Sequence, residues 1–114
     1  MVESYGAESA KEAVPPVRDP LPEPLDPIKA RDLARFILEH GLTSIRGHVL
    51  DEMKKEKPPL TQVDVTNVIR AGAYQAPEME KGTWRYRIHT QRIAVVIAFR
   101  SERELRAVTA WRFR

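Results

Sequence analysis

The sequence has 114 residues, of which 42% are hydrophobic and 31% charged, so we expect one small soluble globular domain. The absence of cysteine excludes disulfides, thiolate catalysis and cysteine-based zinc sites, and it favours a cytoplasmic location. No apolar run approaches the roughly 18–20 residues of a membrane span, and no signal-peptide pattern is visible, so we expect no membrane association. The net charge is +3, and its uneven distribution is more informative than its size.

The first 27 residues differ in composition from the rest of the chain. They contain six of the nine prolines, and residues 1–26 hold six acids against two bases. Because proline lacks a backbone donor and fixes φ, we expect residues 1–27 to form a disordered or extended acidic tail. It is either a plain linker or a segment that lies over the basic domain or engages a partner. Residues 28–114 then form the single folded domain.

The folded domain is predicted to begin with a well-delimited helix. Asp26 is placed to cap it, Pro27 suits its first position, and Gly41 suits a left-handed terminator. Residues 42–46 then favour a short strand.

Two further helices follow this strand. The second begins near Gly47–His48 and ends before the pair Pro58–Pro59, because proline interrupts a helix. The third begins at Thr61, which with Asp64 approximates a capping box, and ends at Gly72.

After Gly72 the hydrophobic period changes from helical to two. We predict strands over residues 83–90, 92–100 and 104–112, with a short edge strand over 73–76. Nine Lys and Arg against three Glu in residues 80–114 give this part a basic character that suits phosphate binding, although a solubilising surface shows the same pattern. We therefore expect an α+β fold with the helices on one face of a three- to four-stranded antiparallel sheet.

The register of the first two long strands predicts a basic face. A two-residue turn at Thr90–Gln91 places Arg87 opposite Ala94. The alternation then buries Trp84, Tyr86 and Ile88 and leaves the other face to basic and small side chains, where a polyanion has room to bind. An ordinary solvated face is the alternative. The residues of this face are Arg85, Arg87, His89, Ala94, Val96 and Ala98.

The side on which the third strand places its residues depends on the length of the preceding loop. A three-residue loop, 101–103, buries Leu105, Ala107, Thr109 and Trp111 and adds Arg106 and Arg112 to the basic face. A two-residue loop reverses both sets. We favour the longer loop because it exposes neither Leu105 nor Trp111.

No pattern for a cofactor or metal ion is found. The glycines form no phosphate-binding loop, no nucleophile elbow occurs, and His40, His48 and His89 never stand four residues apart. His48 falls at a strand-to-helix junction, where backbone amides favour an anion. A packed or surface histidine is the alternative.

Four segments occur in an order that resembles a known family. They are SIRGHVLDEM, LTQVDVTNVIRAG, WRYRI, and the pair IAVVIAF and AVTAW, which lie within residues 43–111. The stretch resembles a family of small prokaryotic domains of unknown function related to RelE/MqsR-type toxins, in the barnase–EndoU–colicin–RelE ribonuclease superfamily. His48 matches the family's histidine and Met53 its apolar helix position. Glu52 stands where the family commonly has a basic residue, so the chain either lacks that charge or supplies it from elsewhere, for example from Arg46 or Arg85.

The resemblance implies a RelE-like fold and a metal-independent endoribonuclease, a toxin neutralised by a protein antitoxin. In such enzymes the RNA 2′-hydroxyl attacks its own phosphate, so no cofactor is needed. We expect His48 and His89 to exchange the protons and Arg87, with Arg85 behind it, to hold the scissile phosphate. The cations expected to guide the RNA backbone are Arg46, Arg106 and Arg112.

Two other functions remain open. A non-catalytic module would use the same basic face for nucleic acid, or the acidic tail for a protein partner. A degenerate toxin fold would serve as a structural subunit of a larger assembly. Glu52 and the lack of lysine on the expected basic face leave room for the binding module.

Overall fold

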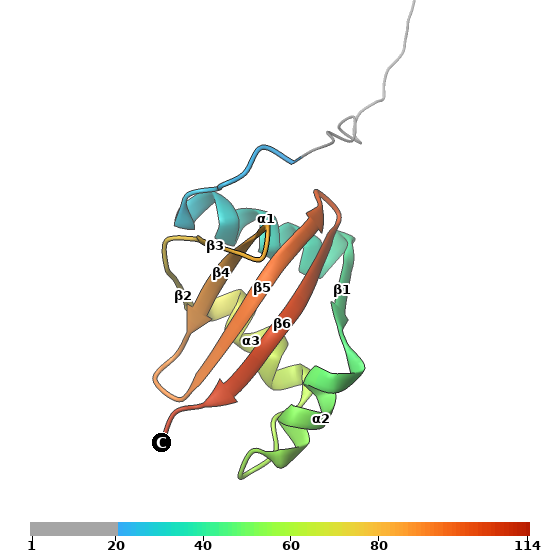
Figure 1. The fold of residues 1–114 in the computed structure, drawn as a ribbon, viewed down its shortest axis with the longest axis vertical. Coiled ribbons are helices and arrows are strands. Elements are labelled where there is room, and N and C mark those ends of the chain that lie inside the picture. The colour runs from blue at the N-terminus through green and yellow to red at the C-terminus, as the bar shows by residue number, and fades with distance from the viewer. Residues whose placement is uncertain (1–20) are drawn as a thin grey trace, which may run out of the picture.

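The computed structural model describes residues 21–114, and the predicted tail up to residue 20 lies outside the described part. The α+β class is confirmed (Figure 1). Asp26 caps the first helix, and the capping box of Thr61 and Asp64 begins the third, as predicted. The elements, in chain order, are α1 (Pro27–His40), β1 (Leu42–Ile45), α2 (Gly47–Lys55), α3 (Gln62–Ala71), β2 (Ala73–Tyr74), β3 (Glu78–Glu80), β4 (Thr83–His89), β5 (Ile93–Ser101) and β6 (Glu104–Arg112).

The sheet is larger than expected and is mixed rather than antiparallel. Five of its six strands run in the order β1-β6-β5-β4-β2, and the sixth, β3, pairs with β4 alone. The expectation of three or four antiparallel strands is wrong at two places: β1 joins the edge parallel to β6, and β3 forms a hairpin with β4. Lys81 and Gly82 connect β3 to β4 with φ values of 53° and 78°, the backbone that a tight hairpin turn requires.

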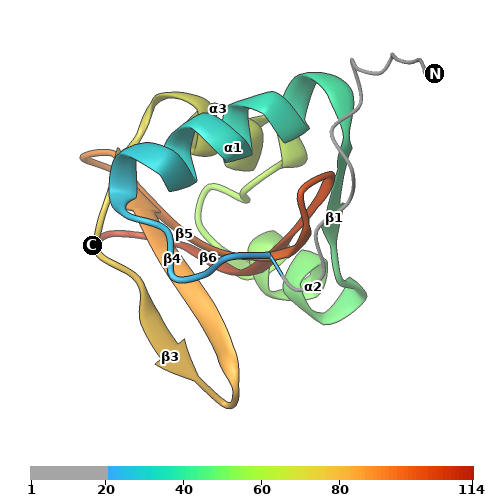
Figure 2. The ribbon, with the colours of Figure 1, turned by 90° about the horizontal axis from the view of Figure 1, so that it is seen from above.

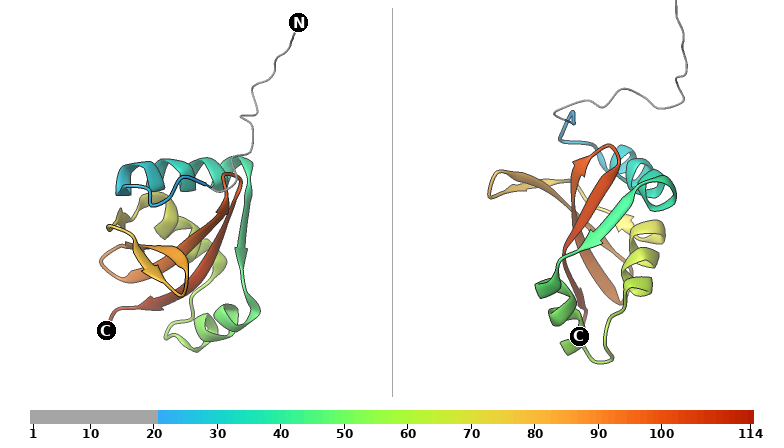
Figure 3. Two further views of the ribbon diagram at one scale, coloured as in Figure 1. Left: turned by 45° about the horizontal axis from the view of Figure 1, so that its top comes forward. Right: turned by 90° about the vertical axis from the view of Figure 1, so that its right-hand side faces the viewer.

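Helices cover one face of the sheet and leave the other largely bare. Helices α1 and α3 lie side by side on what we call the closed face (Figures 1 and 3), while α2 packs at the end of the sheet beside β6. The β3–β4 hairpin extends on the opposite side, which we call the open face (Figure 2). No helix in the described part of the chain has the length and apolar character needed to cross a membrane. The strands contribute to the closed-face core Tyr86, Ile88, Val95, Ile97, Leu105 and Ala107.

The turn between β4 and β5 lies one residue later than predicted. Thr90 and Ile93 close it around Gln91 and Arg92: the Thr90 amide donates to the Ile93 carbonyl at 2.9 Å, and the Thr90 hydroxyl accepts the Ile93 amide at 3.1 Å. Arg87 therefore stands opposite Val96, and its predicted position opposite Ala94 is wrong. Since the register shifts by two residues, every side chain keeps the face that the alternation predicts.

The side chains in the first half of β6 lie on the predicted faces, although the turn before the strand differs from the predicted one. The turn has two residues, 102–103, but an irregularity near Arg100 restores the register, so Leu105 and Ala107 are buried. The predicted three-residue loop is therefore wrong, whereas the predicted burial of Leu105 and Ala107 is confirmed.

The second half of β6 faces the other way. A bulge at Val108 inserts an extra residue, so Ile97 pairs with Ala107 while the preceding Val96 pairs with Thr109. The expected core positions of Thr109 and Trp111 are therefore wrong. Both lie on the open face, and Ala110 is buried in their place.

Gly41 ends α1 for a different reason from the one predicted. Its backbone is extended, with φ of −123°, so the expected left-handed conformation is wrong. A side chain at this position would collide with the carbonyl of Arg103, whose oxygen accepts the Leu42 amide at 2.8 Å. Glycine here permits the close approach of the β5–β6 turn.

Residues 21–26, the described end of the predicted tail, have no regular secondary structure and lie against the domain. Leu21 and Leu25 pack against the core. The buried Tyr86 hydroxyl donates to the Glu23 carboxylate at 2.9 Å and accepts the Leu25 amide at 3.0 Å. These contacts attach the segment to β4.

Candidate nucleic-acid interface

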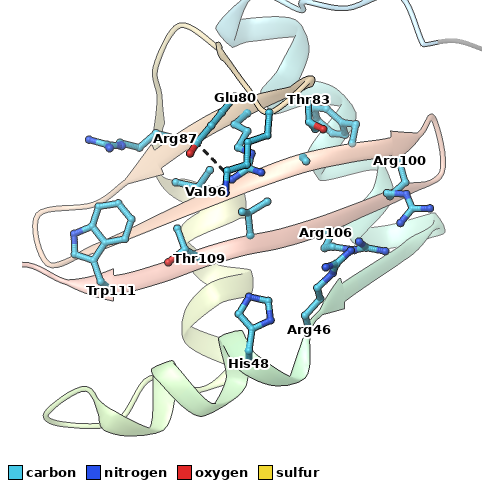
Figure 4. Close-up of a pocket in the computed structure, with 15 residues that line it drawn as sticks. Arg46, His48, Glu80, Thr83, Arg87, Val96, Arg100, Arg106, Thr109 and Trp111 are labelled. Atoms are coloured by element: carbon cyan, nitrogen blue, oxygen red, sulfur yellow. Dashed lines mark ion pairs between the residues drawn. The ribbon is translucent and has the colours of Figure 1, made fainter.

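The open face contains a groove of about 790 Å³ (Figure 4). Its floor is formed by β5 and β6, with short side chains such as Val96 and Ala98. One wall is the β3–β4 hairpin, which leaves the sheet because β5 pairs with β4 only from Tyr86 onward. The other wall is the end of β1 and the start of α2. The groove thus joins elements that are far apart in the sequence.

The lining of the groove is strongly cationic. Five of the predicted site residues meet in it: Arg46, His48, Arg85, Arg87 and Arg106. Two further cations, Lys81 and Arg100, were missed by sequence reasoning, as was Glu80, the only carboxylate that residues 21–114 contribute to the lining. The Lys-Gly turn was the available signal for Glu80 and Lys81. Among these described residues, six Lys and Arg against one Glu make this a site for an anion with several charges.

Three arginines crowd one end of the groove. Arg46, Arg100 and Arg106 converge there in Figure 4, from the junction of β1 and α2, from β5 and from β6. Partial desolvation, together with the charges of Arg46 and Arg100, lowers the pKa of Arg106 from its ordinary value. Arginine nevertheless stays protonated, so the three like charges repel one another. A bound phosphate would relieve this repulsion.

Arg85 is held against the hairpin wall. Its guanidinium lies 3.6 Å from the Glu80 carboxylate, the pair marked in Figure 4. Its Nε is buried and lacks a hydrogen-bond partner within the described structure. An unpaired buried donor is costly, and a movement of the side chain that turns this Nε toward an oxygen ligand in the groove would satisfy it.

His48 projects into the groove from the first turn of α2 (Figure 4). Its side chain is exposed, and the positive end of the helix macrodipole favours an anion beside it. Glu52, at the position where the resembling family has a basic residue, lies farther along α2, outside the lining, 3.4 Å from Lys55. The groove's positive charges therefore come from other elements, including Arg46 and Arg85.

His89 lies on the open face but not in the groove lining. Its Nδ1 is 3.3 Å from the Thr90 carbonyl oxygen, and its ring meets Phe113 edge-on at 6.5 Å. The structure therefore does not bring His48 and His89 together around the groove.

Arg112 is not on the basic face, and this part of the prediction is wrong because the bulge at Val108 reverses the end of β6. Its guanidinium donates to the carbonyls of Pro58 and Pro59 at 2.7 and 3.4 Å. Its amide donates to the Glu56 carboxylate at 2.9 Å. Arg112 thus ties β6 to the segment after α2.

The chemistry available in the groove is ionic and acid–base. Across residues 21–114, no three His, Asp or Glu side chains gather as metal ligands would. One imidazole and one carboxylate project from opposite walls, His48 from α2 and Glu80 from β3 (Figure 4). The arrangement can bind a phosphodiester chain and move a proton on either side of it.

Comparison of the chain with family models, curated proteins and solved structures finds no match. The resemblance to RelE-type toxins therefore stays a prediction. The function is argued below from the geometry of the groove.

Proposed function

We propose that this protein is a metal-independent endoribonuclease that binds RNA in the groove of the open face. The observation that carries the proposal is that His48 and Glu80 project from opposite walls of the groove, whose other described lining residues are cations, short neutral or apolar side chains, Phe99 and Trp111. Imidazole and carboxylate groups are common acid–base catalysts near neutral pH. The surrounding cations supply the phosphate binding that such a reaction needs.

The reaction divides between these groups. One of the pair His48 and Glu80 takes the proton of the 2′-hydroxyl, whose oxygen attacks the adjacent phosphorus. The phosphorus–O5′ bond breaks, and the other group donates its proton to the leaving oxygen. Arg87 and Arg85 stabilise the additional negative charge of the pentacoordinate phosphorus. The products are a 2′,3′-cyclic phosphate and a 5′-hydroxyl.

The same proposal includes a RelE-like fold and a toxin role. It is supported by the order of elements, helices followed by an antiparallel meander, and by His48 at the start of the second helix. A protein antitoxin would neutralise the toxin by covering the cationic groove.

A second candidate is a binding module that does not cleave. His89 lies outside the groove, so the two-histidine pair expected from the sequence is not assembled. This observation favours binding without catalysis if Glu80 does not transfer a proton. RNA binding that weakens with salt and yields no cleavage products would establish the second candidate.

The test is induced expression in a bacterial host with growth and RNA 5′ ends followed together. Wild type should arrest growth and produce new 5′-hydroxyl ends, and His48→Ala and Arg87→Ala should each lose both effects. The matched control is His40→Ala, an exposed histidine at the end of α1, which should behave as wild type. Circular dichroism establishes that the variants are folded. Full activity in both groove variants would overturn the site assignment.

A further inference from the structure

Three aromatic rings lie close together on the open face beside the groove. His89 on β4 and Trp111 on β6 flank Ala94 of β5, which they leave with no exposed surface. Phe113 follows, with its ring 6.5 Å from each of the other two and nearly perpendicular to both. We call His89, Trp111 and Phe113 the aromatic end of the open face.

Trp111 connects this aromatic end to the cationic groove. It lines the groove because the bulge at Val108 turns it away from the core. The guanidinium carbon of Arg87 lies 5.3 Å from the centre of its ring (Figure 4). Arg87 is exposed, so its flexible side chain is free to move from the ring to a ligand. A flat apolar surface and a phosphate-binding cation therefore lie side by side.

This juxtaposition matches the chemistry of one nucleotide. The phosphate suits the guanidinium, and the base suits an aromatic ring on which it can stack. Phe113, with 46% of its surface exposed, widens the apolar surface next to Trp111. In a duplex the faces of the bases are covered by their neighbours, so only an unpaired base can use such a platform.

We propose that Trp111, supported by Phe113, stacks an unpaired nucleobase adjacent to the phosphate that Arg87 binds. The platform makes the groove selective for single-stranded RNA. This inference rests on the proposed function, because it takes the groove to bind RNA. It does not depend on catalysis.

The experiment measures binding of RNA that cannot be cleaved. Three probes are used: a single-stranded 2′-O-methyl oligonucleotide, the same backbone with abasic sites, and the 2′-O-methyl duplex. The chain has two tryptophans, so Trp84→Phe leaves Trp111 as the only indole fluorophore. Trp111→Leu removes the aromatic face and keeps apolar bulk, while Trp111→Phe keeps a smaller aromatic face. Thermal unfolding checks that each variant is folded.

Stacking predicts four results. The single strand quenches the fluorescence of Trp84→Phe, and the abasic strand does not. Trp111→Leu binds the single strand about tenfold more weakly than wild type. Trp111→Phe recovers part of that loss. The duplex binds more weakly than the single strand.

The outcomes separate this inference from the proposed function. If single-stranded and abasic probes bind equally well and Trp111→Leu changes neither, the groove binds phosphates and the stacking inference is overturned alone. If no probe binds, RNA binding fails and both proposals are overturned.

Discussion

The two faces of the sheet are built from the same strands but contribute differently to the stability of the fold. On β4, Tyr86 and Ile88 have no exposed surface and pack under the helices, whereas Arg85 and Arg87, the alternate residues, line the groove. The closed face is fixed by burial of apolar area. The open face gathers mostly positive charges, and the three arginines at one end of the groove repel one another and do not stabilise the fold. Stability and binding should therefore be separable by substitution.

The largest expected effect is on the closed face. Ile97 is fully buried on the central strand β5, so Ile97→Ala should lower the free energy of unfolding by about 3 kcal/mol through lost burial and a cavity. Urea unfolding measures this loss. Thr109→Ala, on the exposed side of β6, is the control and should stay within about 0.5 kcal/mol of wild type. Equal losses at the two positions would show that the open face is also part of the packed core.

The next effect separates binding from stability on the open face. Arg46→Gln combined with Arg106→Gln should weaken binding of single-stranded RNA at least about tenfold and reduce its dependence on salt. The free energy of unfolding should stay constant or rise, because two of three repelling charges are removed.

Arg112→Gln is the matched control for these arginines. It also lies on β6 but donates to the Pro58 and Pro59 carbonyls, so it should leave RNA binding unchanged and cost about 1 kcal/mol of stability. An Arg112 variant that binds as poorly as the double variant would mean that overall charge, and not the groove, determines affinity.

A smaller effect tests the hairpin wall. Gly82 has φ of 78°, so Gly82→Ala should destabilise the β3–β4 turn by about 1 kcal/mol. Gly47→Ala is the control, because a side chain there meets nothing within 4 Å and the position is helical. Thermal unfolding compares the two variants. A loss of stability in Gly47→Ala as large as that in Gly82→Ala would show that the backbone conformation of the turn is not the cause of the loss.

The closed face was predictable because its signals are local. Asp26 and the pair Thr61–Asp64 mark helix starts with their own side chains, and alternation along β4 assigns Tyr86 and Arg87 to opposite faces without knowledge of the register. An error of two residues in the β4–β5 register therefore left both faces correct.

The open face was less predictable because it depends on pairing between distant segments. The bulge at Val108 results from how β6 fits against β5, and no residue pattern within β6 signals it. It accounts for the misplacement of both Trp111 and Arg112. The parallel pairing of β1 with β6, which brings Arg46 beside Arg106, is likewise set by the tertiary structure. Four of the groove's arginines and His48 were thus predictable one by one, whereas Lys81, Arg100 and the assembly of the groove were not.

The smallest expected effect concerns Glu23, in the segment 21–26 that packs against the domain. Burial raises the pKa of Glu23, and the hydrogen bond from Tyr86 opposes the shift only in part. The folded protein therefore favours the protonated carboxyl. Below the pKa of the unfolded chain, Glu23 is protonated in both states and its stabilising contribution is complete. As the pH rises through the pKa of the folded state, this contribution is lost.

Glu23→Gln isolates this effect, since the amide oxygen can accept the same hydrogen bond from Tyr86 without ionising. The variant should be more stable than wild type at pH 7, and the difference should shrink as the pH falls to about 4. Urea unfolding at the two pH values measures it. Glu39→Gln, an exposed acid on α1, is the control for the loss of one negative charge. Only a carboxyl whose pKa shifts on folding can make the stability difference between variant and wild type depend on pH. If both variants differ from wild type by the same amount at both pH values, the effect is therefore due to net charge.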